Sequence, residues 1–257
     1  MTQDERLDYL LHCLLAERKE YADIRMPDDL SEKRRLLRSL MNVRPPVPAS
    51  AEFLAVQDAY LQESLSERGV TRLQDMRSAQ PGLYLWQGDI TTLAVDAIVN
   101  AANSQMLGCF VPCHGCIDNA IHTYAGVQLR LECAHVMAAQ KEEEHTGGAK
   151  ITKAYNLPCH YVLHTVGPII HGSVTQTDRE LLASCYRSCL ELAAEYGLYS
   201  VAFCCISTGE FHFPNELAAQ IAIQTVTDWQ KQNANQMEVI FNVFKDSDRK
   251  IYERLLR

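Results

Sequence analysis

Residues 88–126 constrain the fold of this chain more than any other stretch. An apolar run, Val95–Val99, leads into the amide-rich turn Asn100-Ala101-Ala102-Asn103, and a helical pattern begins near Ile117. Open α/β sheets use a strand, a polar loop and a helix in this order to build ligand sites outside the carboxyl ends of their strands. The stretch therefore predicts an α/β sheet with a ligand site between the turn and the helix.

The loop inside this stretch carries Cys109, Cys113, His114 and Cys116 within eight residues. Thiolate sulfur and imidazole nitrogen are preferred zinc ligands. The segment 112–116 satisfies the P-C-x-x-C half of the zinc deaminase signature, but no His-x-Glu or Cys-x-Glu precedes it, so the deaminase interpretation fails. Ligation by Cys109, His114 and Cys116 would leave a fourth zinc position open, as in catalytic sites. Cys113 as a fourth ligand would close the site and make it structural.

From Gly82 onward the chain alternates between strand-like and helix-like segments. Several strand-like segments are unbroken apolar runs, as in Val201–Ile206, which is typical of strands covered on both faces. We expect strands at 83–87, 96–100, 151–156, 161–166, 201–206 and 238–243, and helices at 117–140, 178–196, 215–232 and 246–256. The sequence thus predicts an α/β fold with a largely parallel or mixed sheet between helical layers.

Residues 1–75 lack strong strand signals and are expected to be helical. Further helices are expected at 27–42 and 50–68, and a first helix is indicated by leucines at helical spacing, namely Leu7, Leu10, Leu11, Leu14 and Leu15. We therefore divide the chain into a helical extension, residues 1–75, and an α/β domain, residues 76–257. The extension is expected to be a structural cap on the domain, and a partner-binding arm is the alternative.

Composition narrows the environment and the partners. The net charge of -8 argues against a nucleic-acid partner held by a broad basic surface. No apolar run approaches the ~18 residues of a membrane span, and no signal peptide is evident near the start. Ten cysteines without an export signal indicate buried thiols and a metal site rather than disulfides. We expect a cytoplasmic protein, with buried thiols at Cys13, Cys133, Cys185, Cys189, Cys204 and Cys205.

Two further loops and one helix start carry groups suited to a nucleotide. Ser207-Thr208-Gly209-Glu210-Phe211 follows a buried strand and precedes a helix, so its backbone amides could turn toward a phosphate. The Gly88-Asp89-Ile90-Thr91 turn offers a carboxylate to an exocyclic amine, although an ordinary Asx-type turn is the better explanation when this turn is taken alone. Asp118 and Asn119 lie near a helix start, where an acid can cap the helix or accept from a sugar hydroxyl or water.

Taken together and in order, these segments resemble the macrodomain, the ADP-ribose-binding α/β/α fold. The resemblance covers residues 83 to 257 and rests on Gly88-Asp89-Ile90, Val99–Asn103, Asp118-x-Ala120-Ile121-His122, Ala125-Gly126, His164–Pro168 and Ile206–Gly209. Ordinary hydrolytic macrodomains carry a glycine run where this chain carries 108–116. That replacement and the helical extension resemble the zinc-containing macrodomains of bacteria and fungi. The resemblance implies a three-layer α/β/α domain with a mixed central sheet.

The resemblance also implies residue roles. Cys109, His114 and Cys116 would ligate zinc, with Cys113 left out, and Asp118 and Asn103 would be catalytic. Asp118 would orient a water or accept its proton. ADP-ribose would be bound at the adenine by Asp89 and Ile90, with Phe244 stacked on the ring, and at the distal ribose by Asn103. Asn119 would also contact the ligand. The diphosphate would be surrounded by Ser207, Thr208, Gly209, Glu210 and Phe211.

The implied activity is zinc-dependent removal of mono-ADP-ribose from modified protein side chains, with carboxylate linkages favoured. A lipoyl-carrier protein modified by a sirtuin-like transferase is the partner that the resemblance suggests. Two alternatives stay open on the residues. One is a reader module that binds ADP-ribose without cleaving anything. The other is a hydrolase of small ADP-ribose esters in which the zinc is purely structural.

Overall fold

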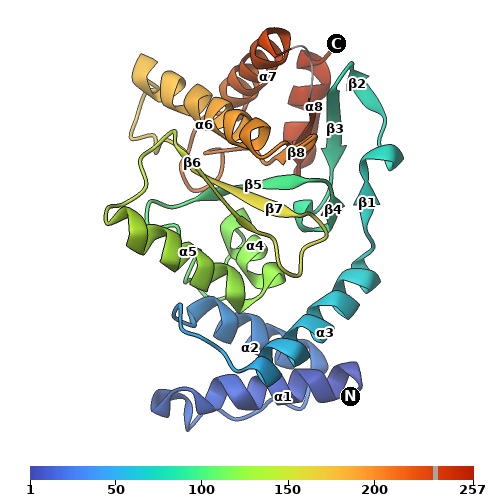
Figure 1. The fold of residues 1–257 in the computed structure, drawn as a ribbon, viewed down its shortest axis with the longest axis vertical. Coiled ribbons are helices and arrows are strands. Elements are labelled where there is room, and N and C mark those ends of the chain that lie inside the picture. The colour runs from blue at the N-terminus through green and yellow to red at the C-terminus, as the bar shows by residue number, and fades with distance from the viewer. Residues whose placement is uncertain (234–236) are drawn as a thin grey trace.

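The computed structural model describes residues 1–233 and 237–257, and its centre is a seven-stranded mixed sheet (Figure 1). The strands are β2 (Ser78–Gln80), β3 (Leu83–Gln87), β5 (Ala97–Ala102), β6 (Ala149–Lys153), β7 (Tyr161–Val166), β8 (Ser200–Phe203) and β9 (Glu238–Val243), in the spatial order β2-β3-β9-β8-β5-β7-β6. The five inner strands are parallel, and β2 and β6 run antiparallel at the two edges. The parallel inner strands therefore all end at one edge of the sheet.

Helices cover both faces of this sheet (Figure 1). On one face lie α4 (Ile117–Ala125) and α5 (Val127–Gln140), and on the other lie α6 (Gln176–Glu195), α7 (Asn215–Gln232) and α8 (Asp246–Leu255). The inner strands contribute fully buried apolar side chains such as Val99, Leu163 and Ile240 to one continuous core. The predicted three-layer α/β/α architecture with a mixed sheet is confirmed.

The helical extension forms a second, smaller core below α4 and α5 (Figure 1). It consists of α1 (Gln3–Ala16), α2 (Leu30–Val43) and α3 (Ala51–Arg68). Leu7, Leu10, Leu11 and Leu14 of α1 are buried in it, and Val127 of α5 joins the same cluster. The extension is thus packed directly onto the α/β domain. The boundary between residues 75 and 76 stays a prediction. In the described part of the chain, no helix is long and apolar enough to cross a membrane.

Short elements complete the fold. A two-stranded parallel pair joins β1 (Thr71–Arg72) to β4 (Leu93–Ala94), and 3₁₀ turns lie at η1 (Lys19–Tyr21), η2 (Leu73–Asp75) and η3 (Ile90–Thr92).

The structure corrects several predicted boundaries. The helix expected at 117–140 is two helices, because Gly126 has a φ of 95° and separates α4 from α5. The strand expected at 151–156 begins two residues earlier and ends at Lys153, and the strand expected at 201–206 ends at Phe203. The helix expected to begin at residue 27 begins at Leu30, where the Asp29 side chain accepts from the backbone N–H of Glu32.

The predicted burial of the cysteine thiols is confirmed in part. All ten are free thiols. Cys133, Cys185, Cys189 and Cys204 are buried as expected, whereas Cys13 and Cys205 are only partly buried.

Candidate active site

The candidate site lies along the edge where the parallel strands end. In spatial order, β3 leads to Asp89, β9 to Phe244, β8 to Ser207, β5 to Asn103 and β7 to Gly167. Loops at the carboxyl ends of neighbouring parallel strands are where open α/β sheets bind ligands. The predicted adenine, diphosphate and distal-ribose residues therefore fall on one edge, in the order that an extended ADP-ribose requires.

At one end of this edge, Asp89 is held by an arginine from the extension. Its carboxylate accepts from the Arg68 guanidinium at 2.9 Å and from the backbone N–H of Thr91 at 3.0 Å. The Arg68 guanidinium also stacks 3.7 Å above the Tyr124 ring. A cavity of about 460 Å³ opens here, lined by Arg68, Gly69, Val70, Thr71, Trp86, Asp89 and Thr92. Ile90, which follows Asp89, is buried and is not among these lining residues. Arg68 could not be identified from the sequence, because nothing local links the end of α3 to a turn 21 residues later.

In the middle of the edge, the loop 207–211 offers backbone donors. Ser207 has a left-handed φ of 63°, and its buried hydroxyl finds no partner among the described residues. The backbone N–H groups of Gly209, Glu210 and Phe211 likewise donate to no acceptor in the part of the chain described. Gly167 lies directly against this loop, because a Cβ added there would come 2.0 Å from the Ser207 hydroxyl. Successive free amides of this kind form a concavity suited to a phosphate.

The cysteine loop, residues 107–116, brings three donor side chains together. The ligand atoms of Cys109, His114 and Cys116 all lie within 4.8 Å of one another, and Cys109 Sγ is 3.6 Å from His114 Nδ1. Bonds of about 2.0–2.3 Å to a tetrahedral zinc ion place ligand atoms about 3.3–3.8 Å apart. Two thiols and an imidazole fit zinc in their chemistry, and the distance between Cys109 Sγ and His114 Nδ1 falls within this range.

Cys113 faces away from this trio. Its Sγ lies 3.2 Å from the Ser39 hydroxyl and 3.4 Å from the Arg35 carbonyl, both on α2. Its φ is 53°, so the backbone turns sharply between it and His114. Neighbouring side chains such as Cys113 and His114 cannot easily face one ion together, and here only His114 faces the cluster. The geometry brings Cys109, His114 and Cys116 together and leaves Cys113 outside the cluster.

The cysteine loop touches the other predicted ligand loops on both sides. His114 Nε2 lies 3.6 Å from a carboxylate oxygen of Glu210 in the loop 207–211. The Asn103 side-chain N–H₂ donates to the Gly108 carbonyl at 3.3 Å. The donor cluster therefore lies between the predicted diphosphate loop and the predicted distal-ribose residue.

Asp118 lies in the first turn of α4, two residues after Cys116, and is only 5% exposed. Its Oδ1 accepts from the Asn100 side chain at 2.8 Å and lies 3.5 Å from His122 Nε2. Burial raises the pKa of Asp118 to about 6, and the Asn100 hydrogen bond opposes that shift. Burial lowers the pKa of His122 well below its usual range, so His122 is neutral beside Asp118. A desolvated carboxyl next to a donor cluster is typical of a functional site.

Phe244 and Asn119, both predicted to contact ADP-ribose, differ in exposure. Phe244 follows β9 and is 76% exposed, free to meet a base at that end of the edge. Asn119 is fully buried, and both ends of its amide are bonded within the protein, to Arg38 and to the Val111 carbonyl. The contacts of both side chains with ADP-ribose stay predictions. For Asn119 these bonds indicate a bracing role.

The fold and the site together define a class: a three-layer α/β/α domain in which the loop 207–211 adjoins a cluster of two thiols and an imidazole. The Macro domain family profile matches residues 99–222. A protein of Treponema medium named "Protein-ADP-ribose hydrolase" is 56% identical over 260 residues, covering 100% of both chains. A protein of the same name from Staphylococcus aureus (strain MSSA476) is 49% identical over 250 residues, covering 96% of this chain and 94% of that one.

Structural comparison agrees. The Trypanosoma brucei macrodomain, solved in complex with ADP-ribose, superposes with a TM-score of 0.66 at 32% identity, over 86% of this chain and 95% of that one. The chain therefore belongs to the macrodomain family, and its likeness to these hydrolases over its full length makes it an enzyme of the hydrolase class.

Proposed function

We propose that the chain is a zinc-dependent hydrolase that removes mono-ADP-ribose from modified protein side chains and releases ADP-ribose. The observation that carries this proposal is the cluster of Cys109, His114 and Cys116 beside the buried carboxyl of Asp118. A module that only reads ADP-ribose needs neither an open metal position nor a desolvated acid. The names of the bacterial relatives support the same activity.

In the proposed complex, ADP-ribose lies along the carboxyl edge of the sheet. Asp89, already held by Arg68, accepts from the adenine amine, and Phe244 stacks on the ring. The free amides of Gly209, Glu210 and Phe211 donate to the diphosphate. This arrangement directs the distal ribose toward Asn103 and the cysteine loop. The bond to be cleaved then lies between Asp118 and the donor cluster.

The metal and the side chains of the protein would have separate roles in the hydrolysis. Zinc held by Cys109, His114 and Cys116 would supply Lewis-acid character and lower the pKa of water toward neutrality. Asp118 would orient the attacking water and accept its proton, which is the role of a general base. Hydrolysis adds the water hydroxyl to one fragment and its proton to the other, so the products are free ADP-ribose and the unmodified side chain. Glu210 would accept from His114 Nε2 and so keep Nδ1 turned toward the cluster.

The finer parts of the proposal concern the substrate. We propose that the linkage is to an aspartate or glutamate carboxylate, and that the modified protein is a lipoyl carrier acted on by a sirtuin-like transferase. Both rest on the resemblance to zinc-containing macrodomains. A released carboxylate is a better leaving group than an alkoxide or a guanidine, so its cleavage requires less acid assistance at the leaving atom.

A panel of linkages tests the proposal. Proteins carrying mono-ADP-ribose on a carboxylate, on serine or on arginine are incubated with the enzyme, and free ADP-ribose is quantified. We expect release from the carboxylate linkage at least about 10-fold faster than from the other two, a difference of about 1.4 kcal/mol in activation free energy. Tight binding of ADP-ribose without release from any of the three would make the chain a reader and would overturn the proposal. Release confined to serine or arginine would overturn the linkage alone.

A further inference from the structure

The backbone of the cysteine loop is held by side chains from outside the loop. Moving along it, the carbonyls of Leu107 and Cys109 accept from Arg130, and the carbonyl of Val111 accepts from Asn119. The Cys113 N–H and the His114 carbonyl are bonded to residues of α2. The backbone of nearly every second residue in the loop is therefore hydrogen-bonded to a side chain from outside the loop. Two of these hydrogen bonds come from the helical extension.

The first brace from α2 is Arg38. Its guanidinium donates to the carbonyl of His114 at 3.0 Å and twice to Asn119 Oδ1, at 2.8 and 3.2 Å. It thus bridges the backbone of the candidate metal ligand His114 to the first turn of α4. An arginine suits this task because its planar group presents several donors in a fixed geometry, which lysine does not.

The second brace from α2 is Asn42, which is 1% exposed. Its Oδ1 accepts from the Cys113 N–H at 2.9 Å, and its N–H₂ donates to the Thr123 hydroxyl of α4 at 2.9 Å. Cys113 has the left-handed φ that turns the chain between Cys109 and His114. Asn42 therefore stabilises the backbone conformation that lets His114 face the cluster while Cys113 does not.

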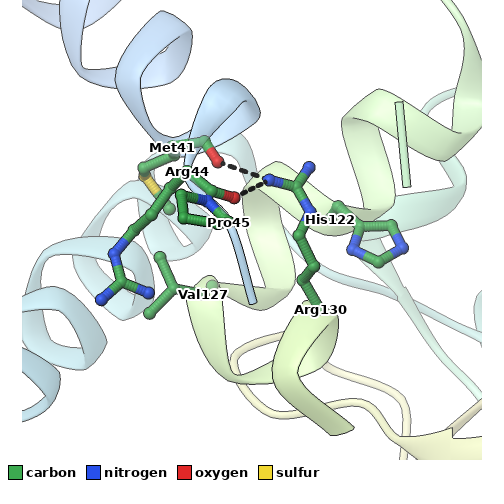
Figure 2. Close-up of a pocket in the computed structure, with 7 residues that line it drawn as sticks. Met41, Arg44, Pro45, His122, Val127 and Arg130 are labelled. Atoms are coloured by element: carbon green, nitrogen blue, oxygen red, sulfur yellow. Dashed lines mark hydrogen bonds between the residues drawn. The ribbon is translucent and has the colours of Figure 1, made fainter. Parts of the chain in front are cut away.

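Arg130 of α5 fastens the end of α2 to the same loop. It donates to the carbonyls of Met41, Asn42 and Arg44 at 3.1, 2.7 and 2.6 Å. Figure 2 shows Arg130 crossing the seam, the contact between α2 and α5, to reach Met41 and Arg44. The cavity in this seam is only about 10 Å³, room for no more than about one water molecule. The seam is a packed joint that links the extension to the cysteine loop, and not a ligand site.

We infer that Arg38 and Asn42 are positioning residues for the metal centre, so that the helical extension forms part of the metal-binding apparatus. The inference rests on the proposed zinc dependence. A loop as short and as turned as 107–116 loses conformational entropy when its three donors converge. Braces that fix its backbone before the ion binds reduce that loss. Outer residues that orient metal ligands typically change metal affinity by about 10–100-fold when removed.

The test uses the full chain and the metal alone. Zinc affinity is measured by competition with a chelator for wild type, Arg38→Ala, Arg38→Lys and Arg35→Ala. Arg35 lies on the exposed side of the same helix, and its substitution removes the same charge while leaving its backbone carbonyl in place. The thiolate-to-metal absorption of the cobalt-substituted proteins is recorded in parallel. A purely structural loss of stability would lower the melting temperature and leave that spectrum unchanged.

We expect Arg38→Ala to weaken zinc binding about 10–100-fold with an altered cobalt spectrum. Arg38→Lys should lie between it and wild type, and Arg35→Ala should stay within about twofold of wild type. Equal zinc affinity and an unchanged spectrum in Arg38→Ala would overturn the inference. If Arg38→Ala does not fold, Arg38→Lys decides in the same way.

The outcomes separate this inference from the proposed function. A wild-type protein that binds no zinc overturns both. Zinc binding that depends on Arg38, in a protein that releases ADP-ribose from no linkage, supports the positioning role and overturns the hydrolase.

Discussion

Replacement of Asp118 by asparagine is expected to lower the rate of ADP-ribose release by about 10²–10⁴-fold, the contribution of a positioned general base. Asparagine has nearly the same shape, but its amide cannot accept a proton from water. The residues predicted to contact the adenine and the diphosphate follow strands β3, β9 and β8, whereas Asp118 lies in helix α4. The affinity for ADP-ribose should therefore change little. Single-turnover release and ADP-ribose binding, measured on the same preparations, check the two expectations separately.

The control for this substitution is Asp23→Asn, which removes an exposed carboxylate from the extension. Zinc content must also be determined for Asp118→Asn, because Asp118 is close to Cys116 in the chain. An Asp118→Asn protein that holds its zinc and releases ADP-ribose at the wild-type rate would contradict the assignment of Asp118 as the base.

The second large effect is expected at Cys116. Cys116→Ser should lower zinc affinity by more than about 100-fold, because a direct ligand contributes more than the outer residues whose loss costs about 10–100-fold. Turnover should fall with zinc content. Serine is chosen because the Cys116 side chain caps α4 by accepting from the Asn119 N–H at 3.4 Å, and a hydroxyl can keep that bond. Zinc stoichiometry and release rate are measured together.

Cys113→Ser is the matched control, because it removes a thiol from the same loop whose sulfur faces α2. It should keep its zinc and its activity. Equal loss of zinc in Cys113→Ser and Cys116→Ser would instead make Cys113 a fourth ligand. The site would then be closed, and the zinc purely structural.

The parts of the fold and of the candidate site that depend on local sequence could be predicted. The unbroken apolar run Val201–Ile206 predicted a strand covered on both faces, and strand β8 occupies its first half. Parallel strands then place the residues that follow them at one edge, which brings Asp89, Asn103 and Ser207 together without knowledge of the loops. The three candidate zinc ligands lie within eight residues, so the short loop itself keeps them close.

The parts that depend on distant pairs could not be predicted. Arg38 meets Asn119 across 81 positions of the chain, and Asn42 meets Cys113 across 71. Before the fold is known, such arginines and amides look like an ordinary solvated helix face. Local signals were also weak at the edge strand Ser78–Gln80, which is too short and polar to stand out, and it was missed. The break between α4 and α5 has a local signal in Gly126, which a continuous apolar pattern concealed.

The most direct test of the central claim is removal and restoration of zinc in the wild-type protein. ADP-ribose release from a carboxylate-linked protein substrate is followed before chelation, after chelation and after one equivalent of zinc is returned, with ADP-ribose affinity measured at each stage. We predict that release is abolished by chelation and restored by zinc, while affinity for ADP-ribose persists throughout. Undiminished release from a protein shown to contain no metal would contradict the account.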